Sequence, residues 1–208
     1  MSNLCNEPST VPPHQRGDTT FDVIAVGIEM LHDDRDDRLE ETCRYVRQHG
    51  LDADTLATHG PILVRPLRFF TGGRFELDDT GTLAAVLPVR DVDACTIRDY
   101  CAWPLGDPTK FAVALGIGDC LGADQIANPA SFAFGQALPI YRLPLTWLKA
   151  GCRGIALLNH FTAWRWLNAA LGPVEAEDPA HARELYKLAR RRPEPVIRSR
   201  SSSMRVAA

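Results

Sequence analysis

The segment from residue 137 to residue 192 reads ALPIYRLPLTWLKAGCRGIALLNHFTAWRWLNAALGPVEAEDPAHARELYKLARRR. Within it, short apolar runs of strand length alternate with longer amphipathic runs that have the spacing of helices. This alternation is typical of an α/β layer, in which helices cover a small sheet. No motif in the segment identifies a reaction, so it predicts architecture more clearly than function.

Three strands and three helices are predicted in this layer. The strands lie at 138–143, 155–158 and 173–176, and the helices lie at 145–150, 163–171 and 180–191. Pro144 and the pair Asp178-Pro179 begin helices, because proline suits a first helical position and aspartate caps free backbone N–H groups. Gly151 and Gly172 end helices, since glycine readily adopts the left-handed conformation at a helix C-terminus.

The apolar faces of the second and third helices are expected to pack on the sheet. The predicted buried positions of the second helix are Ala163, Trp164, Trp166, Leu167, Ala170 and Leu171. The predicted buried positions of the third helix are Ala182, Leu185, Tyr186, Leu188 and Ala189. The strand at 155–158 is apolar throughout, which predicts cover on both of its faces, with Trp147 and Trp164 pressing on it.

The chain before residue 137 predicts other kinds of structure. Residues 1–17 are polar and carry several prolines, which indicates a disordered arm, and helical spacing follows at 21–31 and 36–49. From 62 to 103, strand-like runs alternate with turn signals, which predicts an antiparallel meander of three or four strands. Asp107-Pro108 then predicts a helix through about Leu115.

The expected fold class is therefore α+β, with an N-terminal helical pair, a central antiparallel β-meander and a C-terminal α/β layer. The expected boundaries are 1–17 for the disordered arm, 18–60 for the helical segment, 61–192 for the α/β core domain and 193–208 for a basic flexible tail.

Composition excludes several classes of protein. The net charge of the 208 residues is only −3, so no overall field favours nucleic acid or a membrane. The six cysteines form no C-x-x-C pair, and the chain shows neither an export signal nor a membrane span, which together predict free thiols in a reducing cytoplasm. We expect no bound metal, no cofactor and no membrane partner.

Three patterns suggest binding motifs, but each lacks a required part. The acidic run at 33–41 suggests a calcium loop, yet Arg38 stands where an EF-hand requires glycine. The helix at 36–49 and the run at 52–58 suggest a helix-turn-helix, yet the second element has no Lys, Arg, Asn or Gln to contact DNA. Gly116-Ile117-Gly118 suggests a dinucleotide-binding loop, yet a predicted helix precedes it where that loop needs a strand.

Candidate catalytic side chains follow the predicted strands of the α/β layer. Glu175 and Glu177 lie near the end of the third strand, and His160 follows the second. Because open α/β sheets place their sites beyond the carboxyl ends of strands, these residues are the candidates for an active centre, with Arg142 and Asp91 nearby. The alternative interpretation is structural, with the acids capping the next helix and facing solvent.

The end of the chain is strongly basic. From 181 to 208, eight Lys or Arg residues stand against two Glu residues, a net charge of +6. The predicted polyanion-binding residues are Arg183, Lys187, Arg190, Arg191 and Arg192. Such a stripe can bind phosphates without sequence preference. The alternative is that these cations only complement the helix dipole and continue into a solvated tail.

The sequence thus favours a non-catalytic cytosolic binding or accessory protein that contacts nucleic acid or another polyanion through its basic C-terminal helix and tail. Two alternatives stay open. One is an enzyme that acts on a phosphate-bearing or other anionic substrate with the carboxylates at 175–178. The other is a subunit of a larger assembly, with a protein partner or a second copy of the chain, to which Trp166 at the edge of its helix's apolar arc points.

Overall fold

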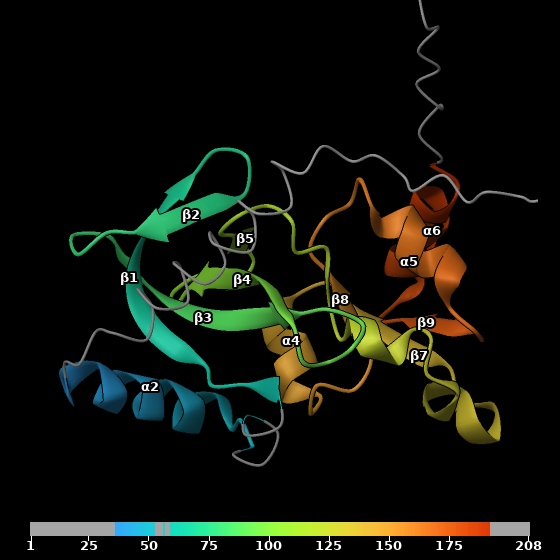
Figure 1. The fold of residues 1–208 in the computed structure, drawn as a ribbon, viewed down its shortest axis with the longest axis horizontal. Helices are drawn as coiled ribbons and strands as arrows, with labels where there is room; N and C mark the ends of the chain where they lie inside the picture. Colours follow the sequence, from blue (N-terminus) through green and yellow to red (C-terminus); the bar gives the residue numbers. More distant parts are fainter. Residues whose placement is uncertain (1–35, 53–55, 57–58, 192–208) are drawn as a thin grey trace, which may run out of the picture.

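The computed structural model describes residues 36–52, 56 and 59–191, and these form a closed β-barrel beside a second, smaller sheet (Figure 1). The described helices are α2 (Asp36–His49), α4 (Pro144–Lys149), α5 (Ala163–Ala169) and α6 (Pro179–Ala189), with short 3-10 helices η1 (Ala123–Gln125) and η2 (Pro129–Gly135). The predicted arm at 1–17, the predicted helix at 21–31 and the predicted tail at 193–208 lie outside the described residues.

Helix α2 has the predicted bounds, and Gly50 ends it with a left-handed backbone. Leu39 is 66% exposed, whereas Tyr45 is buried and accepts a hydrogen bond from the indole N–H of Trp103 at 2.8 Å. The amphipathic pattern therefore predicted the helix correctly. The side chain that it buries against the barrel is Tyr45, which is hydrogen-bonded to Trp103.

The barrel contains strands β1 (Leu63–Phe70), β2 (Arg74–Leu77), β3 (Thr82–Arg90), β4 (Ile97–Pro104) and β5 (Ala112–Val113), in the closed order β1-β2-β5-β4-β3. The first four strands lie where the sequence predicts strands, but their predicted arrangement as a simple meander is wrong. Strand β1 is twice as long as β2. Its residues 67–70 pair with β2, and its residues 63–67 pair with β3. Strand β1 therefore lies between two strands that a meander would join.

The predicted helix from Asp107 to Leu115 is also wrong. The Asp107 carboxylate accepts hydrogen bonds from the backbone N–H and the hydroxyl of Thr109, which forms a local turn that competes with a helix. The chain then enters β5, which pairs in parallel with β2 and antiparallel with β4. Tertiary pairing that closes the barrel thus replaces the local helical preference of this segment.

The smaller sheet contains β6 (Cys120–Leu121), β7 (Leu138–Tyr141), β8 (Ile155–Leu157) and β9 (Val174–Ala176), in the order β6-β8-β7-β9. Strand β7 pairs in parallel with β8 and β9, whereas β6 pairs antiparallel with β8. Strand β8 is buried along its whole length, as its apolar sequence predicts. The carboxyl ends of the three parallel strands consequently meet at one edge of the sheet.

Helices α5 and α6 pack on this sheet with narrower buried faces than expected. Ala163 is buried in α5, but α5 ends at Ala169, and Leu171 beyond it is 61% exposed. Gly172 is not a left-handed cap. A side chain there would collide with the ring of Phe132, so close packing explains the glycine. The Trp164 side chain is half-buried and lies outside the hydrophobic clusters.

The buried stripe of α6 consists of His181, Leu185 and Leu188. Tyr186, which was expected in that stripe, is instead 58% exposed beside Arg190. The helix thus buries positions i, i+4 and i+7, and the neighbouring position of Tyr186 turns to solvent.

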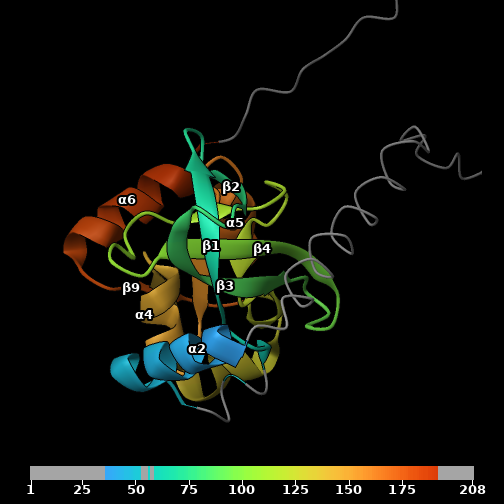
Figure 2. The same cartoon turned by 90° about the vertical axis from the view of Figure 1, so that its left-hand side faces the viewer.

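A continuous core joins the barrel to the smaller sheet. One hydrophobic cluster includes Tyr45 of α2, Val64 and Trp103 of the barrel, Trp147 of α4 and Ala156 of β8. The indole of Trp147 is buried, as predicted, and donates a hydrogen bond to the carbonyl of Gly154 at 2.8 Å. Helices α2 and α6 lie at opposite ends of the molecule in Figure 1, and Figure 2 shows α4 between them.

Candidate functional site

Charged side chains gather at the edge where the parallel strands β7, β8 and β9 end. Arg142 directly follows β7, and Glu177 and Asp178 follow β9 and begin α6. This edge is where open α/β sheets usually place binding sites.

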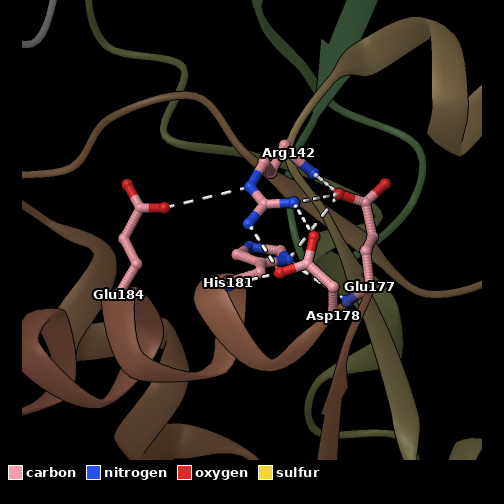
Figure 3. Close-up of polar contacts among 5 residues, drawn as sticks. All are labelled: Arg142, Glu177, Asp178, His181 and Glu184. Carbon is pink, nitrogen blue, oxygen red and sulfur yellow. Dashed lines mark hydrogen bonds and ion pairs between the residues drawn. The ribbon is translucent and has the colours of Figure 1, made fainter.

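Arg142 lies at the centre of this group, with carboxylates on several sides (Figure 3). Its guanidinium binds Asp178 through two parallel hydrogen bonds, Nη1 to Oδ2 at 2.6 Å and Nη2 to Oδ1 at 3.1 Å. Its Nη1 is 3.5 Å from Glu177 Oε2, and its Nε is 3.9 Å from Glu184 Oε2. We call Arg142, Glu177, Asp178, His181 and Glu184 the Arg142 cluster.

The cluster also fixes the beginning of α6. Asp178 is the predicted cap, and its Oδ1 accepts the backbone N–H of His181 at 2.8 Å. The hydrogen bond from Arg142 and the capping bond from His181 together hold the pKa of Asp178 well below its ordinary value. The bond to Asp178 likewise raises the pKa of Arg142. The carboxylates of Glu177, Asp178 and Glu184 thus already form ion pairs with Arg142.

His181 is the buried member of the cluster, with 3% of its surface exposed. Burial lowers its pKa, and the nearby Arg142 adds to that effect. The backbone N–H of Glu177 donates to His181 Nδ1 at 3.2 Å, so the neutral ring carries its proton on Nε2. His181 was not predicted as a site residue, because its position in the apolar stripe of α6 favours a core role.

A cleft of about 210 Å³ adjoins the cluster and contains two histidines. Its polar lining consists of Tyr141, Arg142, His160, His181 and Glu184. His160 is exposed, whereas Glu175 lies on β9 outside this lining. Asp91, expected near Arg142, instead pairs with Arg98 at 3.0 Å in the turn between β3 and β4. The structure thus brings His160, Glu177 and Arg142 to one edge and leaves Glu175 and Asp91 apart.

The basic residues predicted to bind a polyanion begin near the middle of α6 and continue past its end at Ala189. Arg183, Lys187, Arg190 and Arg191 are all exposed, and Arg192 lies outside the described residues. No described carboxylate forms an ion pair with any of these four side chains. The Arg190 guanidinium stacks over the ring of Tyr186 at 4.1 Å from its centroid and hydrogen-bonds its hydroxyl. We call Arg183, Tyr186, Lys187, Arg190 and Arg191 the basic face of α6.

The glycine loop at 116–118 has an internal partner. The backbone N–H groups of Leu115, Ile117 and Gly118 donate to the buried carboxylate of Asp99 at 2.8 to 2.9 Å. A dinucleotide loop would point such groups at a pyrophosphate, but here the chain's own anion takes that place. The expected turn is present, although β5 and not a helix precedes it.

Cys152 is not a prepared nucleophile. Its thiol is buried, and that burial raises its pKa to about 12, so it carries almost no thiolate at neutral pH. Within the described residues, no group of His, Cys, Asp or Glu side chains has the arrangement of a metal site.

Comparisons with family models, with curated proteins and with solved structures found no match for this chain. Among the described residues, no helix has the length and apolar character needed to cross a membrane.

Proposed function

We propose that this chain is a non-catalytic binding or accessory protein that contacts nucleic acid or another polyanion through the basic face of α6. The observation that supports the proposal most is the absence of carboxylate partners for Arg183, Lys187, Arg190 and Arg191 in the described structure. Cations that bind no internal anion keep their charge available for phosphates.

The geometry of the helix adds to this support. Arg183, Tyr186, Lys187 and Arg190 follow the i, i+3, i+4, i+7 spacing that places residues on one side of a helix. Beyond the helix the sequence continues with Arg192, Arg198, Arg200 and Arg205, which extends the positive charge. A cytosolic location is part of the proposal and fits the free thiols of the five described cysteines.

Salt dependence tests the proposal. Fluorescence anisotropy with duplex and single-stranded oligonucleotides of mixed sequence should show binding that ignores sequence. With about five phosphate contacts on a duplex, the slope of log K against log salt should be about −4 to −5. The triple variant Arg183→Ala, Lys187→Ala, Arg190→Ala should flatten that slope by about 3.

A matched control separates a specific face from overall charge. Arg47, Lys149 and Arg153 are exposed cations on other elements, and replacing all three by Ala removes the same charge. This control should retain the parent slope. If both triple variants flatten the slope equally, or if the parent chain does not bind at low salt, the proposal is contradicted. The basic face of α6 is then only a solvated surface.

An enzyme at the Arg142 edge is the second candidate, and one observation favours it: His160 and His181 line the same cleft. Such a site would use imidazoles for acid–base chemistry. An anionic substrate fits poorly there, since three carboxylates already surround Arg142. The assembly-subunit alternative has the exposed rings of Phe134 and Phe161 in its favour.

A further inference from the structure

A second cleft, of about 310 Å³, lies between the barrel and helix α5. We call it the arginine cleft, and its charged and aromatic lining consists of Arg90, Asp91, Arg98, Asp119, Arg165 and Trp166. Small apolar side chains from β3, β6 and η1 complete its wall. None of the predicted site residues belongs to this lining except Asp91, which was expected elsewhere.

The arginines of this cleft differ in what they already bind. Arg98 forms an ion pair with Asp91, and Arg90 donates to the backbone carbonyls of three residues. Arg165 is exposed, and its guanidinium stacks 5.6 Å from the ring centre of Trp164 without a described carboxylate partner. The lining is therefore net positive, and Arg165 has hydrogen-bond donors available for an anion.

Trp166 contributes an unpaired donor beside the same cleft. Its ring is half-buried in the lining, and its Nε1 is buried with no hydrogen-bond acceptor in the described part of the chain. Native structures seldom leave a buried donor unpaired. The Trp166 ring therefore lies in the lining without a described partner that fixes its indole N–H.

One wall of the cleft is rigidly held. Ile117 and Gly118 lie in the lining, and their backbone N–H groups both donate to the buried Asp99 carboxylate. A wall that is ordered before a ligand arrives reduces the entropy lost on binding.

We propose that the arginine cleft binds a nucleoside monophosphate. Its volume is at the lower end of the roughly 300–1,000 Å³ of ligand pockets, which suits one nucleotide and not a dinucleotide. Arg165 binds the phosphate, and the Trp166 indole packs on the base. Asp119 Oδ1 already accepts from Asn159 Nδ2 at 3.1 Å, so the other carboxylate oxygen, Oδ2, accepts from an exocyclic amino group of the base. This assignment favours adenine, cytosine or guanine over uracil, which has no such amino group. It does not depend on the basic face of α6.

Titration calorimetry with AMP, UMP, adenosine and inorganic phosphate tests the proposal. AMP should bind saturably, and adenosine and phosphate should each bind more weakly because each lacks one half of the recognised group. Arg165→Ala should weaken AMP binding by about tenfold or more, the effect of losing a charge-assisted hydrogen bond. Lys149→Ala, a matched exposed cation outside the lining, should leave the affinity unchanged.

Several results would overturn the proposal. These are no AMP binding at millimolar concentration, AMP binding that Arg165→Ala does not weaken, or equal binding of AMP and inorganic phosphate. Equal affinity for AMP and UMP would overturn the role given to Asp119. Trp166→Ala removes the ring that packs on the base and provides a second variant, and it should also weaken AMP binding. The triple variant on α6 should bind AMP normally, so the two proposals can fail separately.

Discussion

Helix α6 and its two cap residues carry charge of two kinds. Asp178, which caps the helix, and Glu184 in its middle face Arg142, and the buried His181 is kept neutral. Arg183 and Lys187 on the helix, and Arg190 at its C-terminal cap, have no described carboxylate partner. One helix with its caps thus includes both a closed ion-pair network and an open row of cations.

This difference helps to separate structural charge from functional charge. The charges of the Arg142 cluster neutralise one another, and their ion pairs hold α6 against the end of β7. Cations left without partners stabilise the fold little, since exposed charges are screened by water, and they remain free for an external anion. Substitutions in the ion-pair network should therefore cost stability, whereas substitutions in the row of unpaired cations should not.

The largest effect is expected at Asp99, a buried carboxylate that accepts four backbone N–H groups. Asp99→Ala leaves these donors unpaired and should lower the free energy of unfolding by on the order of 3–5 kcal/mol, since each unpaired buried donor costs about 1–3 kcal/mol. Urea denaturation measures the loss. Asp107→Ala, at an exposed turn, is the control and should shift the midpoint far less. Similar shifts for the two variants would show that the buried hydrogen bonds of Asp99 do not stabilise this fold.

A smaller but clear loss of stability is expected for Arg142→Ala. The change leaves Glu177, Asp178 and Glu184 close together without their shared cation. Arg183→Ala removes an arginine from the unpaired group and should leave the thermal midpoint almost unchanged. If the two arginine variants melt at the same temperature, the Arg142 cluster is no more structural than the basic face.

A weaker, pH-dependent effect is expected from His181. Because its folded pKa lies below the ordinary value of 6.5, the unfolded chain takes up a proton first as the pH falls. The contribution of His181 to stability is therefore complete above pH 6.5 and declines below it.

Unfolding free energies at about pH 7.5 and about pH 5.5 measure this decline. His181→Asn keeps an acceptor near the Glu177 N–H and should make the decline shallower. His160→Asn, at the exposed histidine of the same cleft, should leave the decline unchanged. A decline that is equally steep in His181→Asn would show that other groups cause it.

The smallest effect on stability is expected for the triple variant Arg183→Ala, Lys187→Ala, Arg190→Ala. Exposed positions without partners usually change stability by less than about 0.5 kcal/mol each. Urea unfolding should therefore place this variant close to the parent chain even where it has lost polyanion binding. Strong destabilisation would assign these cations a structural role and weaken their use as evidence of function.

The sequence predicted the elements of this fold better than their connections. The strands at 74–77 and 155–158 and the cap at Asp178 were visible, because turn residues, apolar runs and capping pairs act locally. The closure of the barrel by β5 could not be predicted from the sequence. Strand β5 has only two residues, and its extended conformation depends on pairing with the distant strands β2 and β4.

The candidate site shows the same limit. Residues that follow parallel strands could be grouped in advance, which brought Glu177, His160 and Arg142 into one hypothesis. His181 was missed, because a histidine in an apolar stripe indicates a core position. Trp166 was predicted as a buried position of its helix and not as a site residue, and only the folded arrangement of α5 shows that it lines a cleft together with Arg165.

The core that joins Tyr45, Trp103, Trp147 and Ala156 has a consequence for synthesis of the chain. A nascent chain that has emerged only to residue 113 holds every barrel strand, yet it lacks the α4 and β8 side chains that cover one side of the barrel core. The apolar surface around Val64 and Trp103 therefore stays exposed to water until α4 and β8 have been synthesised. The barrel therefore matures late, together with the layer that follows it.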